Sequence, residues 1–217
     1  MLSTERSDGD QSMARKRVPK KRVGAGHSGS LMRIVGGKYR GRQIEYDGDA
    51  RTRPMKDRTR EAIFNLLGPA VKSTQVWDLF GGTGAMALEA LSRGAHVATI
   101  VERRFPAARM IHENVARLEL AEAVTVVTAD TFSWWSSAPR PGDRPWVTFC
   151  CPPYALYAER EAELLTLVES LLSDAPPSSF TVLEFDKRFD AAKLPKHGEW
   201  DVRTYPPATV AIFDGGP

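Results

Sequence analysis

Short apolar runs alternate with longer segments of helical spacing from residue 75 onward. The runs at 76–80, 96–102 and 124–130 are each typical of a buried strand. Between and after them, Ala85 to Arg93 and Arg109 to Leu118 have the spacing of helices. Strands that alternate with helices favour a parallel sheet with helices on both faces. The pattern therefore predicts an α/β protein of Rossmann-like type.

The second half of the chain adds four more expected strands. Trp146 to Phe149 is a further apolar run, and it is followed by a helix near 156–173 and a strand at 180–185. A closing pair of strands is expected near 199–205 and 208–213. With the first three strands, these segments predict a mostly parallel sheet of seven strands.

The first third of the chain has a different character. Residues 1–31 are basic, rich in glycine and serine and almost free of apolar positions, so we expect a disordered tail. Arg33 to Arg42 is typical of a short hairpin with glycine bends, and Asp57 to Gly68 of a helix. We therefore divide the chain into a basic tail (1–31), a hairpin-and-helix extension that faces RNA (32–70) and an α/β domain (71–217).

Composition narrows the class of protein. The 217 residues are 42% hydrophobic, which fits one sizeable globular domain. No apolar run approaches the ~20 residues that span a bilayer, so no membrane partner is expected. The only cysteines, Cys150 and Cys151, are adjacent, which indicates reduced thiols in a cytoplasmic protein. The four histidines lack metal-ligand spacing, so we expect no metal, and we expect a monomer because nothing in the sequence demands a dimer.

A glycine-rich turn follows the first of the predicted strands. In Phe80-Gly81-Gly82-Thr83-Gly84, backbone N–H groups can approach a ligand at the start of a helix. Asp78, Glu102 and Asp130 lie at the ends of successive strands, where open α/β sheets bind their ligands. Glu102 is placed to accept hydrogen bonds from ribose hydroxyls, and Asp130 from an adenine amine. The pattern predicts a nucleoside cofactor, and an NAD-dependent enzyme is still an alternative at this point.

A Pro-Pro-aromatic turn ends the fourth strand. In Cys151-Pro152-Pro153-Tyr154, the prolines supply no N–H, so backbone carbonyls stay available as acceptors, and the tyrosine offers a flat stacking face. Such a turn suits a planar base with an exocyclic amine, and a dehydrogenase has no use for it. It resembles the (Asp/Asn)-Pro-Pro-(Tyr/Phe) motif of methyltransferases that act on base amines. We therefore predict these four residues as the catalytic site of an S-adenosylmethionine-dependent methyltransferase.

Basic residues recur through the extension and predict a surface for RNA. A charged helix face is usually just solvated, but a hairpin and helix start this rich in arginine favour contact with phosphates. The tail before them is either a solubilising segment or a second phosphate-binding arm. The predicted RNA-binding residues are Arg33, Lys38, Arg40, Arg42, Arg53, Arg58 and Arg60.

Several of these motifs occur in an order that resembles one known family. The chain is similar to the RsmD family over residues 32 to about 155, and Asn114 matches a further family position. The resemblance implies a class I methyltransferase fold and methyl transfer from S-adenosylmethionine to the exocyclic N2 of a guanine in small-subunit (16S) ribosomal RNA. The motifs are Arg33-Ile34-Val35-Gly36-Gly37, Gly41-Arg42, Arg53-Pro54, Asp57-Arg58-Thr59-Arg60-Glu61, Phe64-Asn65, Phe80-Gly81-Gly82-Thr83-Gly84 and Leu88-Glu89-Ala90-Leu91-Ser92-Arg93-Gly94.

One departure from the family pattern matters for the chemistry. Cys151 stands where the family carries an aspartate, whose carboxylate, with the first proline carbonyl, accepts the protons of the guanine amine. A thiol is a weak acceptor, and losing a hydrogen bond to a charged group costs about 1.5–3 kcal/mol, or one to two decades in rate. We expect a slow enzyme. The alternatives are an RNA-binding or ribosome assembly factor that has lost its chemistry, and an adenine-N6 methyltransferase of nucleic acids.

Overall fold

The computed structural model describes residues 30–49, 52, 54–139 and 142–217. The predicted disordered tail therefore lies outside the described residues, except for its last two positions. Ser30 and Leu31 belong to a strand, so the boundary of the extension lies before residue 32. Arg53, one of the predicted RNA-binding residues, also lies outside the described part.

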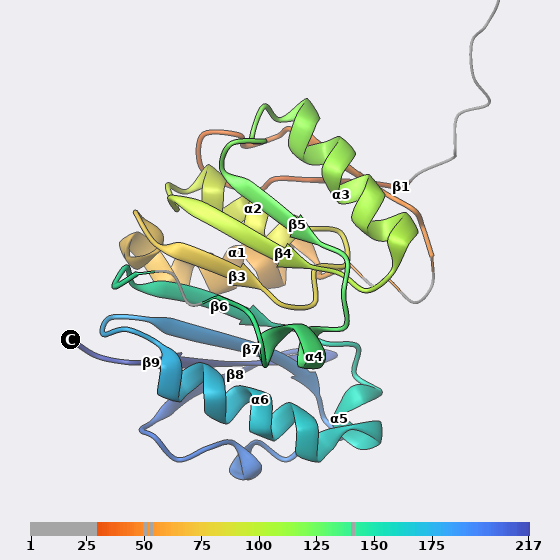
Figure 1. The fold of residues 1–217 in the computed structure, drawn as a ribbon. Coiled ribbons are helices and arrows are strands. Elements are labelled where there is room, and N and C mark those ends of the chain that lie inside the picture. The colour runs from red at the N-terminus through yellow and green to blue at the C-terminus, as the bar shows by residue number, and fades with distance from the viewer. Residues whose placement is uncertain (1–29, 50–51, 53, 140–141) are drawn as a thin grey trace, which may run out of the picture.

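A seven-stranded sheet forms the centre of the described chain (Figure 1). Its order is β5-β4-β3-β6-β7-β9-β8, and β9 runs in the direction opposite to the other six strands. The predicted mostly parallel sheet of seven strands is confirmed. The strands are β3 (Gln75–Asp78), β4 (Val97–Val101), β5 (Val124–Val127), β6 (Trp146–Cys150), β7 (Phe180–Asp186), β8 (Trp200–Tyr205) and β9 (Ala208–Asp214).

Helices cover both faces of this sheet, as the sequence predicts. On one face the buried side chains of the sheet pack against α1 (Asp57–Leu67), α2 (Ala85–Ser92) and α3 (Phe105–Arg117). On the other face they pack against α4 (Thr131–Trp135), α5 (Leu156–Glu159) and α6 (Glu161–Asp174). Two 3-10 helices complete the described fold, η1 (Gly68–Val71) and η2 (Ala191–Lys193).

The two faces have separate hydrophobic clusters of different composition. The cluster under α1 is aliphatic apart from Phe64 and Phe149, whose ring centroids lie 5.5 Å apart. The cluster on the α6 face contains three tryptophans, Trp77, Trp135 and Trp146, in edge-to-face contact. Successive residues of a strand point to opposite faces, so neighbouring positions of β3 and β6 contribute to different clusters.

The N-terminal extension is built into the same core. Strand β1 (Ser30–Arg33) pairs antiparallel with β2 (Gln43–Tyr46), so the predicted hairpin exists with a longer turn than the sequence indicates. Ile34 and Ile44 are fully buried in the hydrophobic cluster between the sheet and α1, α2 and α3. The Asn114 side chain accepts from the Glu45 backbone N–H (3.0 Å) and donates to its carbonyl (2.7 Å). This pair of bonds attaches β2 to α3 and explains the use of an asparagine there.

Three element predictions are wrong in detail. Helix α3 begins at Phe105 rather than near 109, because Pro106 is favourable in a first turn, where its missing N–H has no helical partner. The single helix expected near 156–173 is two helices separated at Arg160. The short helix α4 has no counterpart in the prediction. None of the helices in the described ranges combines the length and apolar character that a bilayer crossing requires.

Candidate active site

The order of the strands defines where a ligand can bind. The chain moves from β3 outward to β5 and then returns to β6, which pairs with β3 on its other side. At such a switch point the following loops diverge and leave a crevice at the carboxyl ends of the strands. A cavity of about 730 Å³ lies there. The predicted residues that line it are Asp78, Phe80, Gly81, Gly82, Thr83, Glu102, Asp130, Cys151, Pro152, Pro153 and Tyr154.

The glycine turn forms the floor of this cavity for steric reasons. A Cβ at Gly81 would lie 2.5 Å from Ile100 Cγ2, so the turn packs against β4 only with a glycine. Gly82 and Gly84 have φ values of +53° and +74°, which L side chains rarely adopt. Gly84 does not itself line the cavity; it precedes the first residue of α2. The turn thus exposes backbone rather than side chains to a ligand.

Asp78 is the most buried acid of the cavity, with 2% of its surface exposed. Its Oδ2 accepts from the Ala87 N–H in the first turn of α2 (3.3 Å). Burial raises the pKa of Asp78 from 3.8 to about 7, the hydrogen bond from Ala87 opposes this, and the nearby Glu102 adds to it. The carboxyl therefore takes up a proton near neutral pH unless a cationic ligand stabilises its charge.

Glu102 is held in place by the backbone around it. Its Oε2 accepts from the Gly82 N–H (2.8 Å) and its Oε1 from the Arg104 N–H (2.7 Å). Each oxygen of the carboxylate keeps a second acceptor site, so a ribose diol in the cavity can still be bound. Glu102 therefore links the glycine turn to the end of β4 and presents its charge to the cavity.

Asp130 performs the role of a helix cap as well as lining the cavity. Its Oδ1 accepts from the N–H groups of Phe132 and Ser133, and its Oδ2 accepts from Arg160 (3.0 Å). Partial burial opposes ionisation, but these hydrogen bonds and the charge of Arg160 keep the pKa of Asp130 below its ordinary value. The Arg160 guanidinium lies 4.0 Å from the Phe132 ring centroid. Phe132 also lines the cavity, although no motif in the sequence predicts it as a site residue.

The Cys-Pro-Pro-Tyr turn follows β6, the strand paired with β3, and lines the same cavity as the glycine turn. Cys150 is fully buried in the tryptophan-rich cluster, whereas Cys151 is half-buried at the cavity, and both are free thiols. Burial, with the charges of Glu184 and Asp78, raises the pKa of the Cys151 thiol well above its ordinary value. Cys151 is therefore a neutral thiol near neutral pH. The Tyr154 hydroxyl donates to Glu184 Oε1 (2.7 Å), which places a further, unpredicted acid in the cavity.

The prediction that Arg60 belongs to the RNA surface is wrong. Its side chain is fully buried, so it does not meet a phosphate. It donates to the carbonyl of Arg33 (2.6 Å) and to Asp57 (2.9 Å), and its Nε lies 3.6 Å from the buried carboxylate of Glu89. The sequence did not reveal this, because the charge and spacing of the arginines do not distinguish an arginine in a buried ion pair from an exposed one.

The other predicted basic residues that the structure describes are exposed but lie in different places. The Lys38 N–H donates to the carbonyl of Ser92, the last residue of α2, and Arg42 donates to the carbonyl of Arg117, the last of α3. Both helices begin beside the cavity and end away from it. The turn between β1 and β2, which also contains the exposed Arg40, therefore lies at the ends of these helices that are distant from the cavity. Arg33 forms an ion pair with Asp57, and Arg58 is exposed. Among the residues that the structure describes, the cations that line the cavity are Lys56, Arg103, Arg104 and Arg188.

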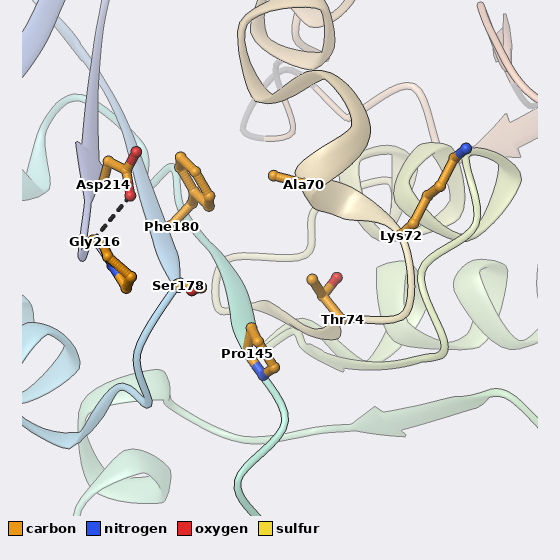
Figure 2. A pocket seen from close by; sticks show the side chains of 9 residues that line it. Ala70, Lys72, Thr74, Pro145, Ser178, Phe180, Asp214 and Gly216 are labelled. Carbon is orange, nitrogen blue, oxygen red and sulfur yellow. Dashed lines mark hydrogen bonds between the residues drawn. The ribbon is translucent and has the colours of Figure 1, made fainter.

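A smaller hollow of about 370 Å³ lies at the amino-terminal ends of the parallel strands, away from the cavity described above (Figure 2). Its lining includes Pro145 just before β6, Phe180 at the start of β7, and Asp214, whose side chain accepts from the Gly216 N–H (2.9 Å). It contains none of the predicted site residues. Within the described residues, no group of three histidine, cysteine or acidic side chains is arranged to hold a metal.

Comparison with known proteins identifies the family. The model of the family described as "Conserved hypothetical protein 95" matches residues 32–213. The chain belongs to this family. The resemblance to the RsmD family is thereby confirmed, and so is the Rossmann-like methyltransferase fold.

Individual members of the family agree with this assignment. Ribosomal RNA small subunit methyltransferase D of Escherichia coli (strain K12) is 37% identical over 59% of this chain, and the match spans 63% of that protein's length. YlbH of Bacillus subtilis (strain 168) is 31% identical over 73% of this chain and 85% of its own length. The solved structure of yhhF from Escherichia coli covers 85% of this chain and 98% of its own, with a TM-score of 0.71 and 26% identity.

Proposed function

We propose that the protein is an S-adenosylmethionine-dependent methyltransferase that modifies the exocyclic N2 of a guanine in small-subunit ribosomal RNA. One observation carries the proposal: the glycine turn with its acids and the Pro-Pro-Tyr turn line one and the same cavity. A nucleoside cofactor and a planar base are thereby accommodated next to each other. The name of the Escherichia coli relative, a small-subunit rRNA methyltransferase, supports the choice of RNA.

The residues present fit this cofactor. A backbone floor at Gly81 and Gly82 admits a ligand at close range, Glu102 suits the ribose diol, and Phe80 and Phe132 supply apolar surface for the adenine. Asp78, at the end of β3, has a raised pKa, so a cationic ligand would restore its charge. S-adenosylmethionine supplies a methyl group on a positively charged sulfur. The protein's own contribution is to bind both partners and hold them in line.

The target base would be held by the Cys-Pro-Pro-Tyr turn. The Pro152 carbonyl is an acceptor for an amine proton, and the Tyr154 ring offers a face for stacking. Cys151 contributes little as an acceptor because its thiol stays neutral. For the RNA backbone, Lys56 and Arg188 at the cavity are better placed than the distant turn that contains Lys38 and Arg40. The same proposal includes a cytoplasmic monomer with ribosomal RNA or the small subunit as its partner.

The experiment that tests this function measures transfer of a labelled methyl group from S-adenosylmethionine to unmodified small ribosomal subunits. Nucleoside analysis of the product is expected to show N2-methylguanine. Cys151→Asp, run in parallel, is expected to be about 10- to 100-fold faster, because it restores a charged acceptor beside the amine. Transfer by neither protein, despite cofactor binding, would refute the proposal and favour an RNA-binding or assembly role. N6-methyladenine as product would favour the adenine alternative.

A further inference from the structure

Glu184 lies beside Cys151 because of the register of two parallel strands. Cys150 of β6 is paired with Leu183 of β7, and both side chains point into the tryptophan-rich cluster. The next residue of each strand, Cys151 and Glu184, must point to the opposite face. On that face the cavity lies, and both residues line it. A carboxylate from the neighbouring strand is thus next to the position where the family carries aspartate.

The contacts of Glu184 give this carboxylate a defined place. The Tyr154 hydroxyl donates to its Oε1 (2.7 Å), and the Tyr157 hydroxyl donates to its backbone carbonyl (3.1 Å). Its charge is the largest electrostatic influence on the pKa of Cys151 after burial itself. A carboxylate has two oxygens with about four acceptor sites, so it can accept from several donors at once, from protein side chains and from a ligand. Groups fixed in this way are suited to binding a base in one orientation.

The remaining acids of the described cavity lining have other roles. Asp78 accepts from a backbone N–H of α2, and Glu102 accepts from the glycine turn. Asp130 caps α4 and forms an ion pair with Arg160. Glu184 is the one whose side chain contacts the Pro-Pro-Tyr turn. It is therefore the carboxylate nearest to the expected position of the base.

We propose that Glu184 recognises the target base by accepting hydrogen bonds from guanine N1–H and N2–H, and so compensates in part for the acceptor that Cys151 does not supply. This inference rests on the proposed function. The two donors of guanine are adjacent on its Watson–Crick edge and point the same way, which matches the two oxygens of a carboxylate. Adenine presents a lone pair at N1, which a carboxylate repels. Glu184 would therefore select guanine over adenine, and the Pro152 carbonyl would accept the second amine proton.

The test compares Glu184→Gln, Tyr154→Phe and the double variant with the native protein. An amide keeps one acceptor but turns a donor toward the guanine donors, so Glu184→Gln is expected to lower kcat/KM for ribosomal subunits about 10- to 100-fold. Tyr154→Phe removes only the hydroxyl that orients Glu184 and is expected to cost less. The double variant is expected to be slower than Tyr154→Phe. Equal rates for the three variants would show that Glu184 acts only by holding Tyr154, and would overturn the proposal.

A second measurement separates this inference from the proposed function. Ligand-detected NMR with guanosine and adenosine monophosphates, on protein saturated with S-adenosylhomocysteine, reports base preference without chemistry. The native protein is expected to prefer the guanine nucleotide and Glu184→Gln to lose that preference, with unchanged S-adenosylhomocysteine affinity and thermal unfolding. A preference that survives the substitution overturns the role of Glu184, even if methyl transfer occurs. A Glu184-dependent preference without methyl transfer supports the role while the proposed function fails.

Discussion

Replacing Arg60 tests whether this arginine belongs to the core rather than to an RNA surface. Both Arg60 and its neighbour Glu89 have fully buried side chains, and Arg60 Nε lies 3.6 Å from Glu89 Oε2. Glu89 also accepts from the Val35 N–H (2.8 Å) and from Arg93 (2.9 Å). The hydrogen bonds and ion pairs of Arg60 and Glu89 therefore connect the N-terminal extension, α1 and α2. Arg60→Met keeps the length and apolar stem of the side chain and removes only its hydrogen bonds and charge.

The expected cost follows from what the substitution leaves behind. The carbonyls of Arg33 and Met55 lose their donor, and the negative charge of Glu89 keeps only part of its compensation. Breaking a buried ion pair from one side costs about 3–5 kcal/mol in the free energy of unfolding. For a domain of this size each kcal/mol lowers Tm by about 2–4 °C, so a fall of about 10 °C is expected.

Urea unfolding followed by tryptophan fluorescence measures this free energy directly, because the core contains Trp77, Trp135 and Trp146. Arg58→Met is the matched control, since Arg58 lies on the same helix but is exposed, and it should stay within about 0.5 kcal/mol of the native protein. A loss below about 1 kcal/mol for Arg60→Met would refute the reasoning that this arginine is a buried structural residue.

Two further predictions concern the acids of the cavity. Glu102→Gln is expected to weaken S-adenosylhomocysteine binding about 10- to 100-fold by calorimetry, because an amide cannot accept from both backbone N–H groups; exposed Glu113→Gln should change nothing. For Asp78, the pKa in the folded state is about 7, above the ordinary value, so the folded state binds this proton more tightly than the unfolded state does. That contribution to the free energy of unfolding is lost as pH rises through 7. The ligand-free native protein should therefore lose about 3 kcal/mol between pH 5 and pH 8, which Asp78→Asn should abolish; an unchanged pH profile would contradict this.

The sheet was predictable because its strands have strong local signals. Buried parallel strands are continuous apolar runs, and the glycine turn has steric reasons that need no tertiary information. The limits of α3 and the break at Arg160 were not predictable, since helix ends depend on contacts outside the helix. The end of the basic tail was misplaced because Ser30 and Leu31 obtain their strand from pairing with β2, which lies more than ten residues away.

The candidate site was predictable only where its chemistry is contiguous in sequence. The Cys-Pro-Pro-Tyr turn and the glycine turn are short motifs, so their residues could be named before their meeting in one cavity was seen. Glu184 gave no such signal, because an acid inside an apolar strand looks like any exposed position. Its place depends on the register between β6 and β7. A search for acids one residue beyond the expected pairing of neighbouring strands would have found it.

The structure also gives a physical reason why a cysteine is compatible with position 151. Asp78 and Glu184 both act on this position, and each raises the pKa of the thiol. An aspartate there would add a third carboxylate to this group, and holding its charge against burial and like charges would cost stability in the folded state. A neutral thiol avoids that cost to the folded state. If Glu184 supplies the acceptor for guanine, the cysteine lowers the charge of the site while a carboxylate still faces the amine. Stability gained at a functional site commonly trades against rate, so Cys151→Asp is expected to lower the free energy of unfolding while it raises the rate of methyl transfer.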